Sequence, residues 1–210
     1  MRFFLFKHVI MLKETVQFFA EELNKYFTLK LGAPSDGARV VPGNAARAYD
    51  NDTLAGAESI LNKAILSIVN IEEDRVSKKQ ENYVRTDMTV RYKSPPLYLN
   101  IYMLVAINRN NYAQSLTWLG HALQFFQFQN VFTPTTHPSL DSRIQKLIVD
   151  LHTLNFEQIN HLWSTLGGKY LPSVMYKIRQ VTLDEDIIIS DAGVIKEIQL
   201  DEKAIQPVSQ

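Results

Sequence analysis

The densest group of side chains that could do chemistry is an acidic run, Glu72, Glu73 and Asp74, which ends an apolar segment and is followed by Arg75. Carboxylate oxygens are the ligands that hard cations such as Ca²⁺ prefer. Neighbouring side chains on a strand point to opposite faces, however, and the run lacks the D-x-D-x-D-G spacing of a calcium loop. We therefore expect no metal site here and interpret all four residues as candidates for a protein interface.

The histidines and the short motifs offer no catalytic site. The five histidines form neither an H-E-x-x-H motif nor another close spacing of metal ligands. They are His8, His121, His137, His152 and His161. The chain has no G-x-S-x-G elbow, no Walker A loop and no G-x-G-x-x-G fingerprint, and it has no cysteine. We expect no enzyme and no cofactor. The alternative from another class is a small metal-dependent hydrolase with a site around Glu72, Glu73 and a histidine.

Composition narrows the class of partner. The 22 Lys and Arg residues balance the 22 Asp and Glu residues, so no overall field would attract nucleic acid or an anionic membrane. No apolar run reaches the roughly 18 to 20 residues that span a bilayer. Lys7, His8 and Lys13 interrupt the apolar start, and no small-residue cleavage site follows, which argues against a signal peptide. We expect no bound nucleic acid, no direct membrane insertion and synthesis in the cytoplasm.

The elements that position these residues follow from the periodicity of the apolar side chains. Helical spacing predicts helices over 12–27 and 111–128, and a short helix after Asn155, whose spacing to Gln158 is that of a capping box. Strands are predicted within 38–44, 64–72, 97–106, 144–154 and 173–183, with an irregular loop over 45–59 and a polar stretch over 77–87. Without a regular βαβ rhythm, this order predicts an α+β fold, a single largely antiparallel or mixed sheet with helices packed on one face.

The strand over 97–106 raises a question, because only one of its faces is plainly a core face. Leucine, isoleucine, methionine and valine occupy the odd positions, whereas Tyr98, Asn100 and Tyr102 begin the other face. With all helices on one side, this second face needs another cover. Aromatic and amide side chains suit a contact with a second chain. The resemblance given below implies such a chain and makes these three residues candidate interface residues.

The composition changes after Leu183 to short β-branched clusters between acidic turns. Such a segment has little core of its own, but it can become ordered by adding to a sheet edge of a neighbouring protein. Its candidate interface residues are Ile187, Ile189, Ile195 and Ile198.

Four segments in order, 66–75, 95–108, 112–133 and 147–183, resemble the cap, or tail-terminator, proteins of extracellular contractile injection systems, which are phage-tail-like particles of bacteria. The resemblance spans roughly 11–183. It implies a tail-terminator-like cap domain over 11–183, a possible N-terminal extension over 1–10 or a true start at Met11, and a C-terminal extension over 184–210.

The resemblance also implies what the protein does. A cap of this kind is a structural, non-enzymatic homo-hexamer that terminates the inner tube at the end distal to the baseplate and anchors the sheath there. Its partners would be the inner tube protein and the sheath protein, and it would be assembled in the bacterial cytoplasm into a particle that is released or held at a membrane. A scaffold domain unrelated to injection particles is the further alternative.

Overall fold

The computed structural model describes residues 10–35, 37–49, 59–74, 83–86, 89–93, 97–183 and 188–193. Over these residues the helices are α1 (Ile10–Leu31), η1 (Ala45–Arg47, a 3-10 turn), α2 (Tyr112–Phe128) and α3 (Phe156–Thr165). The strands are β1 (Val40–Pro42), β2 (Ala64–Glu73), β3 (Tyr83–Thr86), β4 (Thr89–Lys93), β5 (Leu97–Ile107), β6 (Val131–Phe132), β7 (Leu147–His152), β8 (Ser173–Leu183) and β9 (Ile188–Gly193).

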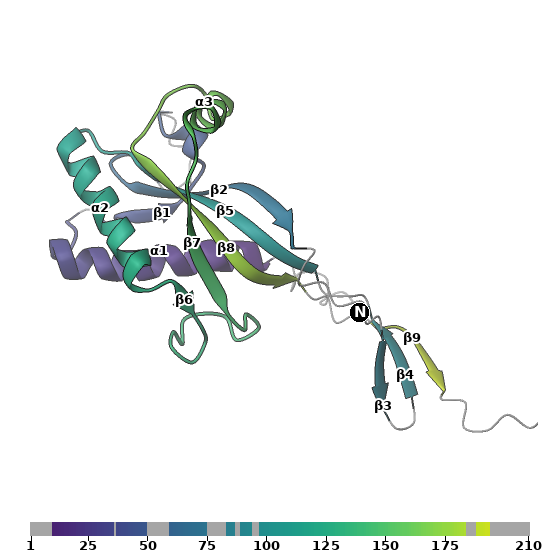
Figure 1. Cartoon of the computed structure of the whole chain (residues 1–210). Helices are drawn as coiled ribbons and strands as arrows, with labels where there is room; N and C mark the ends of the chain where they lie inside the picture. The colour runs from purple at the N-terminus through teal and green to yellow at the C-terminus, as the bar shows by residue number, and fades with distance from the viewer. Residues whose placement is uncertain are drawn as a thin grey trace, which may run out of the picture. The chain divides into compact units, whose positions relative to one another are not determined.

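The chain divides into two compact units, and the larger one is built on a mixed sheet. This unit comprises Met1–Lys78 and Leu97–Leu183. Its six strands follow the order β1-β2-β5-β8-β7-β6, in which β1 is parallel to β2 and the remaining neighbours are antiparallel (Figure 1). The predicted α+β class with a mixed sheet is therefore confirmed.

The first face of the sheet is covered by α1 and α2. The odd side chains of β5 pack into a core with apolar residues of both helices, among them Phe19, Leu23 and Phe126. Phe132 joins this core from β6, with its ring centroid 5.2 Å from that of Phe19 in an edge-to-face contact. Asn111, the first residue of the predicted helix over 111–128, caps α2 and accepts a hydrogen bond from the Gln114 backbone N–H at 3.2 Å.

The second face of the sheet carries α3 and η1, so the expectation that all helices pack on one face is wrong. The even side chains Leu104 and Ala106 of β5 pack in a separate core with Trp163 of α3 and Ala45 of η1. The cause is local: these two positions are apolar, and the apolar stripe of α3 must also be buried. The predicted capping box of Asn155 is present, and Gly167 and Gly168, both with positive φ, follow the end of α3.

The smaller unit comprises Lys79–Pro96 and Asp184–Gln210. It contains an antiparallel sheet of order β3-β4-β9, in which Thr89 lies opposite Gly193 and Val90 opposite Ala192. The sequence analysis did not predict these strands. The segments alternate β-forming residues with arginine, lysine and serine, and so lack the apolar faces on which the other strands were recognised. Part of the C-terminal segment, 188–193, thus pairs within its own chain.

The packing of α3 on the second face leads to a test of stability. Trp163 is 5% exposed, so Trp163→Ala should lower the free energy of unfolding by about 3 to 5 kcal/mol through lost burial and a residual cavity. Phe156→Ala on the same helix is the matched control, because Phe156 is 93% exposed and its truncation should change stability by about 0.5 kcal/mol or less. Chemical denaturation measures both. Equal effects of the two substitutions would contradict this packing.

Candidate subunit-interface site

The antiparallel pairing of β2 and β5 brings together the two groups of interface candidates that the sequence places on different strands. Glu72 lies opposite Asn100 in the register of the two strands. The backbone N–H of Asp74 donates to the carbonyl oxygen of Tyr98 at 2.8 Å, which continues the pairing past the end of β2. The acidic run and the start of β5 therefore form one end of the sheet.

A row of polar side chains crosses the second face of the sheet from this end. It consists of Glu72 on β2, Tyr102 on β5, Lys177 and Arg179 on β8, and Asp150 on β7, and we call it the polar row. The Tyr102 hydroxyl donates to Glu72 Oε2 at 2.8 Å. The Lys177 ammonium lies 4.0 Å from the same oxygen and 5.4 Å from the centroid of the Tyr102 ring. Arg179 Nε lies 2.6 Å from Asp150 Oδ2.

The charges of the polar row alternate in sign and remain accessible. The side chains of Glu72, Asp150 and Arg179 are between 42% and 49% exposed, and that of Lys177 is 28% exposed. Ion pairs at such exposure contribute about 0 to 1 kcal/mol each, because water screens them. The row therefore adds little to the stability of the fold. It presents a polar surface of the kind found at the rim of protein interfaces.

Tyr102 itself is covered by its own chain, and this differs from the expectation that a second chain covers it. Its side chain is 9% exposed and belongs to the core beneath α3. The ring centroid lies 5.0 Å from that of His152 on β7 in an edge-to-face contact. The hydroxyl group joins the polar row, while the ring is core.

Asn100 is buried, whereas Tyr98 is half-buried. The register between β5 and β8 shifts between Leu99 and Ile101, so Asn100 lies at a bulge. Its Oδ1 has no hydrogen-bond partner within the described part of the chain. A buried acceptor without a partner costs about 1 to 3 kcal/mol, which marks this end of the sheet as a place where a further polar group would be favourable.

Several interface candidates are not placed by the structure. Arg75, Ile187, Ile195 and Ile198 lie outside the described residues. Ile189 lies in β9, which pairs with β4, and the structure describes its backbone alone. Their roles at an interface stay predictions.

Lys177, Arg179 and Asp150 were not predicted as site residues from the sequence. Lys177 and Arg179 alternate with Ile178, and Asp150 alternates with Val149 and Leu151, which indicates half-buried strands but not their partners. Only the pairing of β7, β8 and β5 puts opposite charges side by side.

The described residues offer no support for the hydrolase alternative. Within them, no group of three or more histidines and acidic residues is arranged to hold a metal ion. His152 contacts the ring of Tyr102, whose hydroxyl belongs to the polar row. Over the same residues, no helix combines the length and the apolar character needed to cross a bilayer.

The accessibility of the polar row leads to a second test. Asp150→Ala and Arg179→Ala should each change the free energy of unfolding by less than about 1 kcal/mol, with a coupling of the same size in the double variant. Chemical denaturation of the two single variants and the double variant gives this coupling. A coupling of several kcal/mol would assign the pair to the stability of the fold.

Comparison with known proteins finds one matching family model. The family model described as the Pvc16 N-terminal domain matches residues 14–197. The match continues past Leu183, where the resemblance found in the sequence ended. No curated protein sequence matches the chain.

Two solved structures match the chain. One is the sheath/tube terminator of PVC, an extracellular contractile injection system, in the extended state; its TM-score is 0.59 at 11% identity, over 94% of this chain and 65% of the terminator chain. The other is the tube-terminating cap of the anti-feeding prophage, with a TM-score of 0.44 at 16% identity, over 78% of this chain and 57% of the cap chain. At 11% identity the likeness to the PVC terminator concerns the fold alone. The chain spans less than two thirds of the length of either of these proteins.

Proposed function

Because the chain belongs to the Pvc16 N-terminal domain family, we propose that it caps a contractile injection particle, terminating the inner tube and anchoring the sheath at the end distal to the baseplate. In this proposal six copies form a closed ring. The protein acts as a structural part and not as an enzyme. The observation that carries the proposal is the family match over residues 14–197, and the fold it shares with a sheath/tube terminator supports it.

The surface of the larger unit suits a protein that works in an assembly. Between the ends of α1 and α2 lies a groove of about 930 Å³. Its walls include Leu29 and Phe128, which are 79% and 85% exposed, and the more buried rings of Tyr26 and Phe125. Large apolar side chains that gather on a surface mark sites of contact with other proteins. This groove supports the proposal that the subunit has neighbours in the particle.

The ring proposal is tested by imaging particles that contain this chain. Cryo-electron microscopy should place it in a sixfold ring at the tube end away from the baseplate, with about 1,200 to 2,000 Å² buried at each subunit contact, the usual size of a specific interface. The test belongs in the particle, because the tube end can act as the template for the ring. Density for this chain along the sheath or at the baseplate would contradict the proposal.

The C-terminal segment is proposed to couple the ring to the sheath or to a neighbouring subunit. Residues 188–193 pair with β4, and the residues that follow retain the β-branched and acidic pattern of a segment that orders on a partner. Removing 194–210 keeps β9 in place. It should leave a folded protein but give particles whose sheath detaches from the tube end.

Electron microscopy of particles carrying the truncated chain measures this, with circular dichroism as the control for folding. Extended particles with full-length, attached sheaths would show that 194–210 has no such role.

A further inference from the structure

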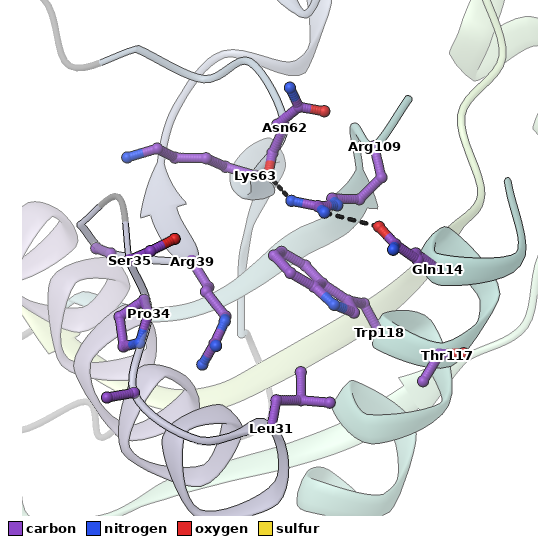
Figure 2. Close-up of a pocket in the computed structure, with 12 residues that line it drawn as sticks. Leu31, Pro34, Ser35, Arg39, Asn62, Lys63, Arg109, Gln114, Thr117 and Trp118 are labelled. Atoms are coloured by element: carbon purple, nitrogen blue, oxygen red, sulfur yellow. Dashed lines mark hydrogen bonds between the residues drawn. The ribbon is translucent and has the colours of Figure 1, made fainter. Parts of the chain in front are cut away.

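A basic pocket lies at the end of the sheet where β2 begins and β5 ends (Figure 2). Its volume is about 360 Å³. Arg39, Lys63 and Arg109 are among the residues that line it. Trp118, which is 7% exposed, forms part of its wall. The pocket therefore combines basic side chains with an aromatic surface.

Arg109 is held in a fixed position in this pocket. It donates from Nη1 to the carbonyl oxygen of Asn62 at 3.1 Å and from Nη2 to Gln114 Oε1 at 2.7 Å. The guanidinium carbon lies 4.6 Å from the centroid of the Trp118 ring. Its Nε is buried and has no hydrogen-bond partner among the described residues. The two hydrogen-bond acceptors are neutral, so neither offsets the charge of Arg109.

Arg39 adds a second guanidinium group on another side of the Trp118 ring (Figure 2). Its Nη1 donates to the carbonyl oxygen of Gly32 at 2.7 Å, again a neutral acceptor. Guanidinium groups bind carboxylates through paired hydrogen bonds, and fixed ones lose little entropy when they do so. The pocket is thus suited to a carboxylate from another protein.

The same subunit carries the complementary charge at the opposite end of β2. The strand runs from Ala64, next to Lys63 of the pocket, to Glu73, where the acidic run of Glu72, Glu73 and Asp74 ends it. At about 3.3 Å per strand residue, the two ends are roughly 30 Å apart. One subunit therefore presents a basic patch and an acidic patch on opposite ends of one strand.

We propose that the basic pocket of one subunit receives the acidic end of β2 from the next copy of this chain. A ring requires a heterologous contact, in which two different and complementary patches of each subunit meet. These two patches satisfy that requirement, and their separation prevents them from meeting within one subunit. The inference rests on the proposed ring and names the surfaces that join its subunits.

Charge reversal at the two patches tests this contact. One variant combines Arg39→Glu with Lys63→Glu, and the other combines Glu72→Lys with Glu73→Lys. Each alone should lower the fraction of capped particle ends about tenfold or more, because like charges then face each other in every contact. Produced together, the two variants should restore capping, since an alternating ring pairs opposite charges throughout.

Matched controls keep the same charge changes away from both patches. Lys13→Glu with Lys169→Glu, and Glu21→Lys with Glu157→Lys, change exposed residues and should leave capping unchanged. Circular dichroism of each purified variant checks the fold. Capping by either reversed variant alone, or no recovery when the two are combined, would overturn the inference.

Crosslinking tests the same contact independently of charge. Because the chain has no cysteine, crosslinks can form only at the introduced cysteines. A chain with Thr117→Cys at the pocket and Glu73→Cys at the acidic end should give a ladder of covalent oligomers in assembled particles with a short bis-maleimide. Thr165→Cys with Glu73→Cys should give none. A sixfold ring without the ladder would overturn this contact and leave the proposed cap intact, whereas absence of the ring itself would overturn the cap.

Discussion

The structure depends on the burial of β5 from both sides. Between Ile101 and Ile107 every side chain of this strand is buried, so the sheet requires an apolar cover on each face. Two long helices cover one face, and a short helix with a 3-10 turn covers the other. Because β5 pairs with β2 and β8, this double burial also fixes the position of the acidic end of β2 and of the polar row.

The consequence for assembly is that the middle of the sheet is closed to partners. Tyr102 contributes its ring to the core and its hydroxyl to the polar row, which leaves the polar row, the ends of the strands and the outer surfaces of the helices for contacts. The basic pocket and the acidic run lie at opposite ends of β2, and exposed apolar side chains lie beside α1 and α2. A subunit with such separated surfaces can contact several neighbours at once, which the proposed ring would require where it meets a tube and a sheath.

The sequence predicted what depends on local patterns and missed what depends on pairing. Two helix starts could be predicted, at Asn111 and at Asn155 with Gln158, because capping is a contact between near neighbours in the chain. The prediction that all helices pack on one face was wrong for α3, because periodicity indicates that Trp163 is buried but not against which face of the sheet. Lys177 could not be matched to Glu72 without the register of three strands, and the sheet of β3, β4 and β9 lacks the apolar alternation on which strand prediction relies.

The central claim is that the sheet is stable within one subunit and that contacts between subunits lie at the ends of its strands. Amide hydrogen exchange of the isolated protein and of the assembled particle tests this claim most directly. The account predicts that β5 and its partners are already protected in the isolated protein, because their hydrogen bonds are buried within the subunit. Assembly should then slow exchange around 71–74 and in the pocket segments 33–39 and 109–117. Slow exchange of β5 that appears only on assembly, with no change at those ends, would contradict it.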